Sequence, residues 1–110
     1  MAIKLTERRM ALDKMLRAIV KKRCGAENVY YQPPTGLKMK YPCICYERDR
    51  IDNSYASDKV YRQTVGYTIT VIDTKADSEM TEAVSALEKC SFSRKFVSDN
   101  LYHDVFTVWN

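Results

Sequence analysis

The sequence predicts an α+β domain in which two helices pack on a single antiparallel β-sheet of about four to five strands. A chain of 110 residues has the length of one domain. Two segments place apolar residues at helical spacing, and the remaining segments either alternate or are rich in β-branched and aromatic residues. The elements are expected in the order α-β-β-β-α-β-β, within one domain that covers residues 1–110.

The first helix is expected at about residues 6–24. Thr6 is a suitable N-cap residue, and Gly25 suits the left-handed conformation that follows many helices. Between these positions, apolar residues recur at helical spacing and predict a buried stripe, which consists of Leu12, Met15, Leu16 and Ile19.

Three strands are expected after this helix. Residues 28–32 and 37–47 have strand-like composition and are separated by the turn sequence PPTG. A long strand at residues 59–73 places four side chains on one face, those of Val65, Tyr67, Ile69 and Val71. The polar stretch RDRIDNSYASD at residues 48–58 has no clear periodicity, so an irregular loop is expected there.

The second helix is expected within residues 77–90, with Ser78 as its N-cap and Met80, Val84 and Leu87 as its buried stripe. Residues 91–97 and 101–109 have the pattern of two strands, and the sequence SDN between them is typical of a hairpin turn.

The net charge of +4 is unevenly distributed along the chain. Residues 1–25 hold eight basic and two acidic side chains, so the first helix carries the positive charge. Lys14, Arg17 and Lys21 lie away from the apolar stripe and form a candidate basic contact face for nucleic acid, an acidic membrane surface or an acidic protein. A solvated face of an amphipathic helix is the simpler interpretation, which we favour.

Residue types that carry chemistry are present without a recognisable site. The four cysteines are expected to be free thiols, because a cytosolic, reducing setting is expected for this chain. Their spacing differs from that of structural zinc sites, and no glycine-rich phosphate loop or calcium loop occurs. His103 is the only histidine, and a pairing with a cysteine nucleophile stays a remote alternative. We therefore expect no catalytic residue, no metal, no cofactor and no enzymatic activity.

The sequence predicts neither a membrane-spanning segment nor a secretory signal, and no membrane partner is expected. No apolar run reaches the roughly 18 residues that cross a bilayer, and the charged N-terminal segment does not resemble a secretory signal. Tyrosine is abundant instead, with six of the eight tyrosines at residues 30–62. Tyrosine is enriched both in subunit interfaces and in sheets, so this surplus fits either role.

Three segments resemble a known family. The run YYQPPTGLKMKYPCICYERDRIDNSYASDKVYR, the run GYTITVID with DSEM, and the closing DNLYHDVFTVW are similar to the small tail terminator proteins, also called tail completion or minor tail proteins, of long-tailed bacteriophages and prophages. The resemblance spans roughly residues 29–109, and its most distinctive part runs from Pro34 to Asp49.

The resemblance implies a structural virion protein that forms a homo-oligomeric ring, usually a hexamer, on the last ring of the tail tube. Such a ring ends tube polymerisation and joins the tail to the head. Its partners would be further copies of itself, the tail tube protein, a head completion protein and the DNA that passes through the channel without sequence specificity. The protein would lie in the host cytoplasm during assembly and in the virion tail afterwards.

Within this family interpretation, the polar loop is expected to make an assembly contact or to line the channel. Its candidate residues are Arg48, Arg50, Asp52, Asn53, Ser54, Tyr55, Asp58 and Lys59. Two alternatives remain: another head-tail component such as a connector or stopper, and a small nucleic-acid-binding regulatory domain that uses the basic first helix.

Overall fold

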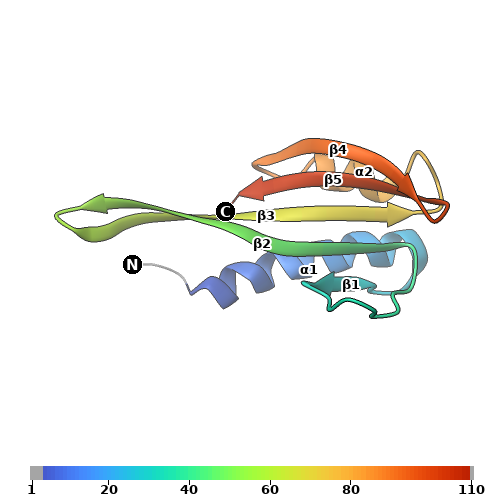
Figure 1. Cartoon of the computed structure of the whole chain (residues 1–110), viewed down its shortest axis with the longest axis horizontal. Coiled ribbons are helices and arrows are strands. Elements are labelled where there is room, and N and C mark those ends of the chain that lie inside the picture. The colour runs from blue at the N-terminus through green and yellow to red at the C-terminus, as the bar shows by residue number, and fades with distance from the viewer. Residues whose placement is uncertain (1–3, 110) are drawn as a thin grey trace.

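The computed structural model describes residues 4–109, apart from the side chain of Tyr61. It has the expected α+β class, with two helices and a mostly antiparallel sheet (Figure 1). Within the described residues, neither helix is long and apolar enough to cross a membrane. The elements are α1 (Leu5–Cys24), β1 (Val29–Tyr31), β2 (Cys43–Ala56), β3 (Lys59–Asp73), α2 (Glu79–Ser85), β4 (Cys90–Ser98) and β5 (Leu101–Trp109).

The five strands form one sheet in the order β1-β2-β3-β5-β4. All neighbouring strands are antiparallel except β1 and β2, which run parallel with Val29 beside Ile44. The expectation of a purely antiparallel sheet is therefore wrong at this edge. Residues 32–42 form a loop that leads from the end of β1 back to the level of its first residue. Strand β2 therefore begins only at Cys43 and runs in the same direction as β1.

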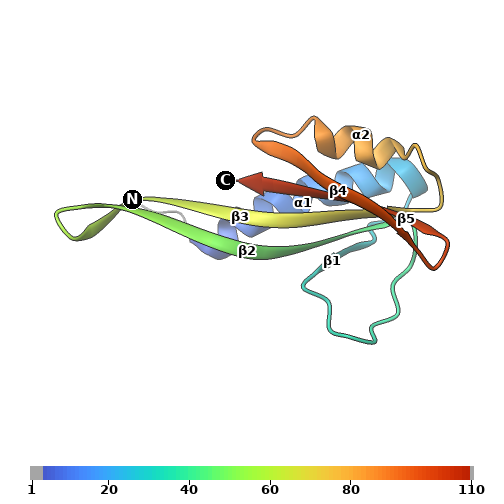
Figure 2. The same ribbon diagram turned by 45° about the horizontal axis from the view of Figure 1, so that its top comes forward.

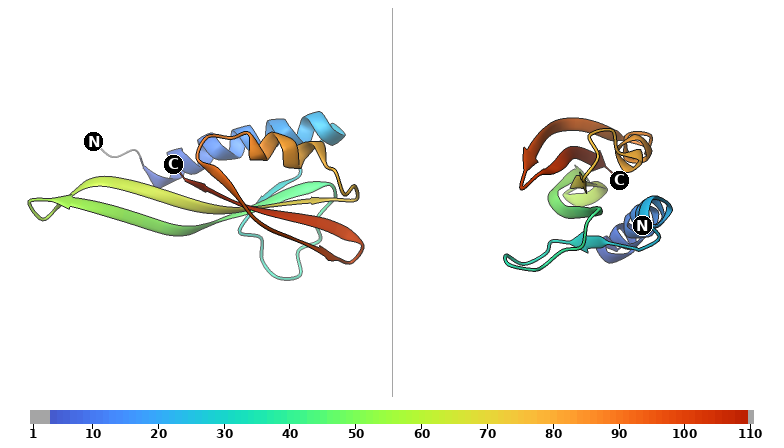
Figure 3. Two further views of the ribbon diagram at one scale, coloured as in Figure 1. Left: turned by 90° about the horizontal axis from the view of Figure 1, so that it is seen from above. Right: turned by 90° about the vertical axis from the view of Figure 1, so that its right-hand side faces the viewer.

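Both helices cover the same face of the sheet (Figure 3). The core lies between them and the sheet, and the stripe that was expected on β3 is buried in it. Its other members come from every element except β4, which contributes only the partly buried Cys90. The buried residues of this core are Leu12, Leu16, Val20, Val29, Ile44, Tyr46, Val65, Tyr67, Ile69, Val71, Met80, Val84, Phe106 and Val108.

Helix α1 differs from its expected form at its start and in its buried stripe. It begins at Leu5, so that Lys4 occupies the N-cap without a side-chain hydrogen bond and Thr6 lies inside the first turn. The Gly25 cap is confirmed, with φ of 79° and a 2.7 Å hydrogen bond from its N–H to the Lys21 carbonyl. Met15 is 47% exposed, because the sheet faces the positions four residues apart at 12, 16 and 20.

The C-terminal half agrees more closely with expectation. The Ser78 hydroxyl caps α2 by accepting a hydrogen bond from the Met80 N–H at 3.2 Å, although the helix is short and Leu87 follows it. Strands β4 and β5 form the expected hairpin, in which Asp99 and Asn100 have φ of 51° and 62°. Two such consecutive residues are typical of the tight type I′ turn.

The segment expected to be an irregular loop is instead part of a long β-hairpin, so that expectation is wrong. Strands β2 and β3 pair from Cys43–Ile72 outward to Ala56–Lys59, and Ser57 and Asp58 make the turn with φ of 51° and 62°. Strand β1 pairs with β2 only as far as Tyr46, and β5 pairs with β3 only from Gly66 onward. Residues 51–64, called the arm below, therefore project from the rest of the sheet as a two-stranded ribbon (Figure 2). The whole molecule, arm included, measures 52 × 26 × 23 Å.

Candidate assembly surface

The arm contains most of the residues that the sequence singled out. Asp52, Asn53, Ser54 and Tyr55 lie along β2, Asp58 lies in the turn, and Lys59 begins β3. Residues 51–60 are all exposed. Pairing across the hairpin brings these side chains onto one projection, but it spreads them along the length of the ribbon.

The two arginines of the predicted set lie at the root of the arm. A β-bulge places Asp49 as an extra residue between Arg48 and Arg50, and the Asp49 carboxylate accepts a hydrogen bond from the Thr68 hydroxyl. The Arg50 guanidinium lies over the Trp109 ring at 5.4 Å from its centroid. These contacts hold the root of the arm to the main sheet.

Gly66 makes this close packing possible. A Cβ atom at position 66 would stand 3.1 Å from a ring carbon of Trp109 and 3.3 Å from a carboxylate oxygen of Asp49. Both distances are shorter than ordinary van der Waals contact. A glycine inside a strand often marks a bulge, and here the bulge lies on the strand opposite it.

Beyond its root the arm has few internal contacts. The Gln63 amide donates a 3.0 Å hydrogen bond to the Asn53 side-chain oxygen, and Arg8 of α1 donates a 3.0 Å hydrogen bond to the Gln63 carbonyl. Near the tip, Tyr55 and Val60 are cross-strand partners that are 65% and 51% exposed. The arm thus ends in apolar side chains that no element of this chain covers among the described residues.

Sequence reasoning missed a buried polar cluster between α1 and β2. Asp13 is buried and accepts 2.5 Å hydrogen bonds from the Tyr46 hydroxyl and from Nε of Arg17. Arg9 donates a 3.2 Å hydrogen bond to the same hydroxyl and lies over the Tyr31 ring at 4.4 Å. Burial, together with the bond to Asp13, raises the pKa of Tyr46 and keeps it neutral. The sequence pattern did not indicate this cluster, because a single aspartate among the charged residues of a helix resembles a solvent-exposed residue.

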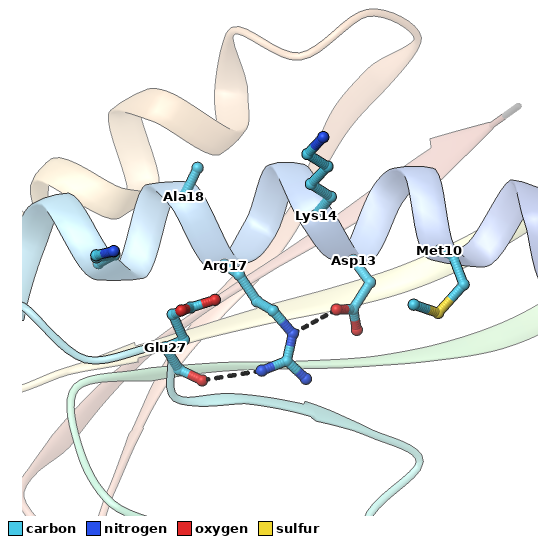
Figure 4. A pocket seen from close by; sticks show the side chains of 7 residues that line it. Met10, Asp13, Lys14, Arg17, Ala18 and Glu27 are labelled. Atoms are coloured by element: carbon cyan, nitrogen blue, oxygen red, sulfur yellow. Dashed lines mark hydrogen bonds and ion pairs between the residues drawn. The ribbon is translucent and has the colours of Figure 1, made fainter.

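The candidate basic face on α1 is only partly available for contact. Lys14, Arg17 and Lys21 line a shallow hollow on this helix, but Arg17 turns inward to Asp13 and to the Glu27 carbonyl at 3.3 Å, while Lys14 points away from that pair (Figure 4). Arg23 is likewise held by Asp73, at 3.1 and 3.2 Å. Much of the positive charge of the helix therefore binds groups of the same chain.

The four cysteines differ in exposure. Cys24 is exposed, Cys43 is buried, and Cys45 and Cys90 are half-buried. Contact with Cys45, followed by burial, raises the pKa of Cys43, which opposes thiolate formation. Across residues 4–109, no group of three or more His, Cys, Asp or Glu side chains could hold a metal ion.

The described side-chain contacts of His103 lie within the β4–β5 hairpin. Its ring stacks on Phe96 with the centroids 4.5 Å apart, and its Nδ1 is 3.0 Å from the Leu101 carbonyl oxygen. No cysteine is among its described partners. These two contacts explain the orientation of the imidazole, and neither of them involves a nucleophile.

No protein-family model and no curated protein matches this chain. Among the described residues, the arm is the feature that best supports a proposal about function.

Proposed function

We propose that this chain is a structural subunit of a phage tail, a tail terminator that assembles head-to-tail into a ring of about six copies. The single observation that carries the proposal is the arm, which projects beyond the sheet with an apolar pair at its tip. The resemblance of residues 29–109 to tail terminator proteins supplies the type of assembly.

The physics of a two-stranded ribbon favours a partner for the arm. An isolated hairpin is marginally stable in water, since it has no face to bury. Arm residues 51–60 are exposed, so the stability of the ribbon comes from its turn, its cross-strand bonds and its root at Arg50 and Asp49. Packing on a neighbouring subunit would bury Tyr55 and Val60 and supply the missing apolar contacts.

A head-to-tail ring also needs two different patches on each subunit. The arm would be one of them, and it reaches outward from the body so that it can meet a neighbour. Such a ring would cap the tail tube, end its polymerisation and offer its other side to a head completion protein. DNA would cross the channel, and Lys14 and Lys21 are the residues of the basic face that could meet phosphates there.

The regulatory nucleic-acid-binding function is less well supported. It needs the basic side chains of α1 to be free to bind phosphate. Arg9, Arg17 and Arg23 instead bind Tyr46, Asp13 and Asp73 respectively. A connector or stopper would share ring formation with the terminator and differ in its position in the particle.

A shortened arm tests the proposal. Residues 53–63 are replaced by Asn-Gly, which joins the paired residues Asp52 and Thr64 by a two-residue turn. We expect a folded subunit with an unchanged circular dichroism spectrum that neither forms rings nor completes tails. The control replaces Lys38 and Lys40 with alanine, because both are exposed and lie outside the arm, in the loop between β1 and β2.

Two readouts decide the outcome. Light scattering over a range of concentrations gives the mass of the free protein, and electron microscopy of tails made with each variant gives their length and completion. A shortened-arm subunit that forms rings and completes tails as the full-length arm does would contradict the proposal.

A further inference from the structure

We propose that the β2 edge of the arm pairs with the free edge of β4 in the next copy of this chain, so that the sheets of neighbouring subunits join. The inference rests on the proposed function and specifies the surface that receives the arm. It is carried by the chemistry of the two edges and by their positions in the sheet.

Strand β4 is the outermost strand of the sheet and, among residues 4–109, has no neighbouring strand on its outer side. Its residues from Ser91 to Ser98 are exposed. Three large apolar side chains are among them, with Phe92 56%, Phe96 39% and Val97 62% exposed. A free edge that carries such side chains is suited to receive another strand.

The charge of β4 is wholly positive. Arg94 and Lys95 lie in the middle of the strand, and it contains no acidic residue. In some proteins, the sole role of basic residues on an edge strand is to prevent aggregation. That role alone does not account for the exposed phenylalanines and valine on either side of them, whereas a receiving surface for an acidic strand accounts for both.

The arm has two free edges, and only one of them complements β4. Its β2 side from residue 51 to the turn contains Asp52 and Asp58 and no basic residue. Its β3 side contains Lys59 and Arg62 and no acidic residue. Repulsion would therefore disfavour the β3 side against Arg94 and Lys95, and attraction would favour the β2 side.

The positions of the two edges suit a ring. In the order β1-β2-β3-β5-β4, the free edge of the arm on β2 faces away from β4, so the two edges lie on opposite sides of the sheet. Contact between opposite sides is head-to-tail, which produces a ring when its rotation closes and does not produce a two-fold dimer. The six arm residues of β2 extend about 20 Å at 3.3 Å each, which the nine residues of β4 can accommodate.

Charge reversal tests the pairing. One variant carries Arg94→Glu and Lys95→Glu, a second carries Asp52→Lys and Asp58→Asn, and a third carries all four changes. Asparagine is chosen at position 58 because the turn holds this residue at φ of 62°, which asparagine tolerates. All four positions are exposed, so the variants should fold, which circular dichroism checks.

We expect each two-residue variant to weaken self-association by about tenfold or more, measured by light scattering, and the four-residue variant to recover it. Association unchanged by both two-residue variants, while the shortened arm abolishes it, would overturn the pairing and leave the ring intact. Failure of the four-residue variant to recover would also overturn it. A wild-type chain that stays monomeric at every concentration would overturn the pairing and the ring together.

Carbodiimide cross-linking of the unmodified protein gives a second readout. This reagent joins an amine to a carboxylate in direct contact, and a mixture of ¹⁵N-labelled and unlabelled chains identifies links between copies. We expect a linked peptide that joins Lys95 of one copy to Asp52 or Asp58 of another. Links from the arm carboxylates to lysines of α1 alone would overturn the pairing.

Discussion

The hydroxyl of Tyr46 donates a 2.5 Å hydrogen bond to the buried carboxylate of Asp13, and this bond joins β2 to the middle of α1. Arg17 and Arg9 complete the cluster, so the buried charge is compensated on both sides. Strand β2 continues from Tyr46 towards the arm. The cluster therefore fixes the position of the strand from which the arm projects.

Tyr46→Phe should destabilise the fold by about 1–3 kcal/mol, because a buried hydrogen bond to a charged group is lost while the ring is kept. Urea unfolding at neutral pH measures the change in the free energy of unfolding. The matched control is Tyr30→Phe, whose hydroxyl accepts an exposed hydrogen bond from the Lys40 N–H, and this should cost less than about 1 kcal/mol. Equal effects of the two changes would contradict the role given to Asp13.

Gly66→Val should destabilise the protein by about 1–3 kcal/mol, because the new side chain meets the Trp109 ring and the Asp49 carboxylate. Trp109 is the only tryptophan, so its fluorescence reports the displacement directly. In a Trp109→Leu background the cost of Gly66→Val should fall, and a double-mutant cycle measures this coupling. Strictly additive effects would show that the contact with Trp109 does not limit position 66.

Asp73→Asn should lower stability at neutral pH and reduce the loss of stability in acid. Burial alone would raise the pKa of Asp73, but hydrogen bonds from Ser78, from Arg23 and from the Lys75 N–H outweigh it and lower the pKa below its usual value. The stability that this carboxylate contributes is present above a pH of about 4 and is lost as the pH falls through the lowered pKa.

Denaturant unfolding at a series of pH values from neutral down to strongly acidic tests this prediction. The native protein should lose more stability in acid than Asp73→Asn does. Glu88→Gln is the control, because it removes one exposed carboxylate that lies outside both the arm and the Asp73 cluster. Parallel acid profiles of the native protein and Asp73→Asn would contradict the prediction.

Replacing the tip pair by Tyr55→Ser and Val60→Thr should change the free energy of unfolding by less than about 0.5 kcal/mol for each substitution, because both side chains are exposed. Ring formation should nevertheless be lost or strongly weakened, as measured by light scattering. Leu37→Ser provides an equally apolar control outside the arm. If the tip variant assembles as well as the control does, the apolar tip is not an interface.

The arm shows why a polar strand is hard to recognise in a sequence. Alternation of apolar and polar residues marks a strand only when one face is buried, and neither face of residues 51–60 is. The turn offered little help, since Ser57 and Asp58 adopt positive φ without a glycine. The β4–β5 turn at Asp99 and Asn100 was recognisable because apolar residues flank it on both sides.

Other differences have tertiary causes. The exposure of Met15 and the burial of Asp13 depend on the side from which the sheet meets α1, which helical spacing alone does not determine. The parallel pairing of β1 with β2 depends on the path of residues 32–42. By contrast, the buried face of β3, the Gly25 cap and the Ser78 cap follow from local patterns, and the structure has all three.

The mass of the purified protein in solution, measured by light scattering over a wide range of concentration, is the most direct test of the central claim that the arm binds a neighbouring subunit. The account predicts a species of about six subunits for the native chain and a monomer for the shortened arm. A native chain and a shortened arm with the same mass at every concentration would contradict it.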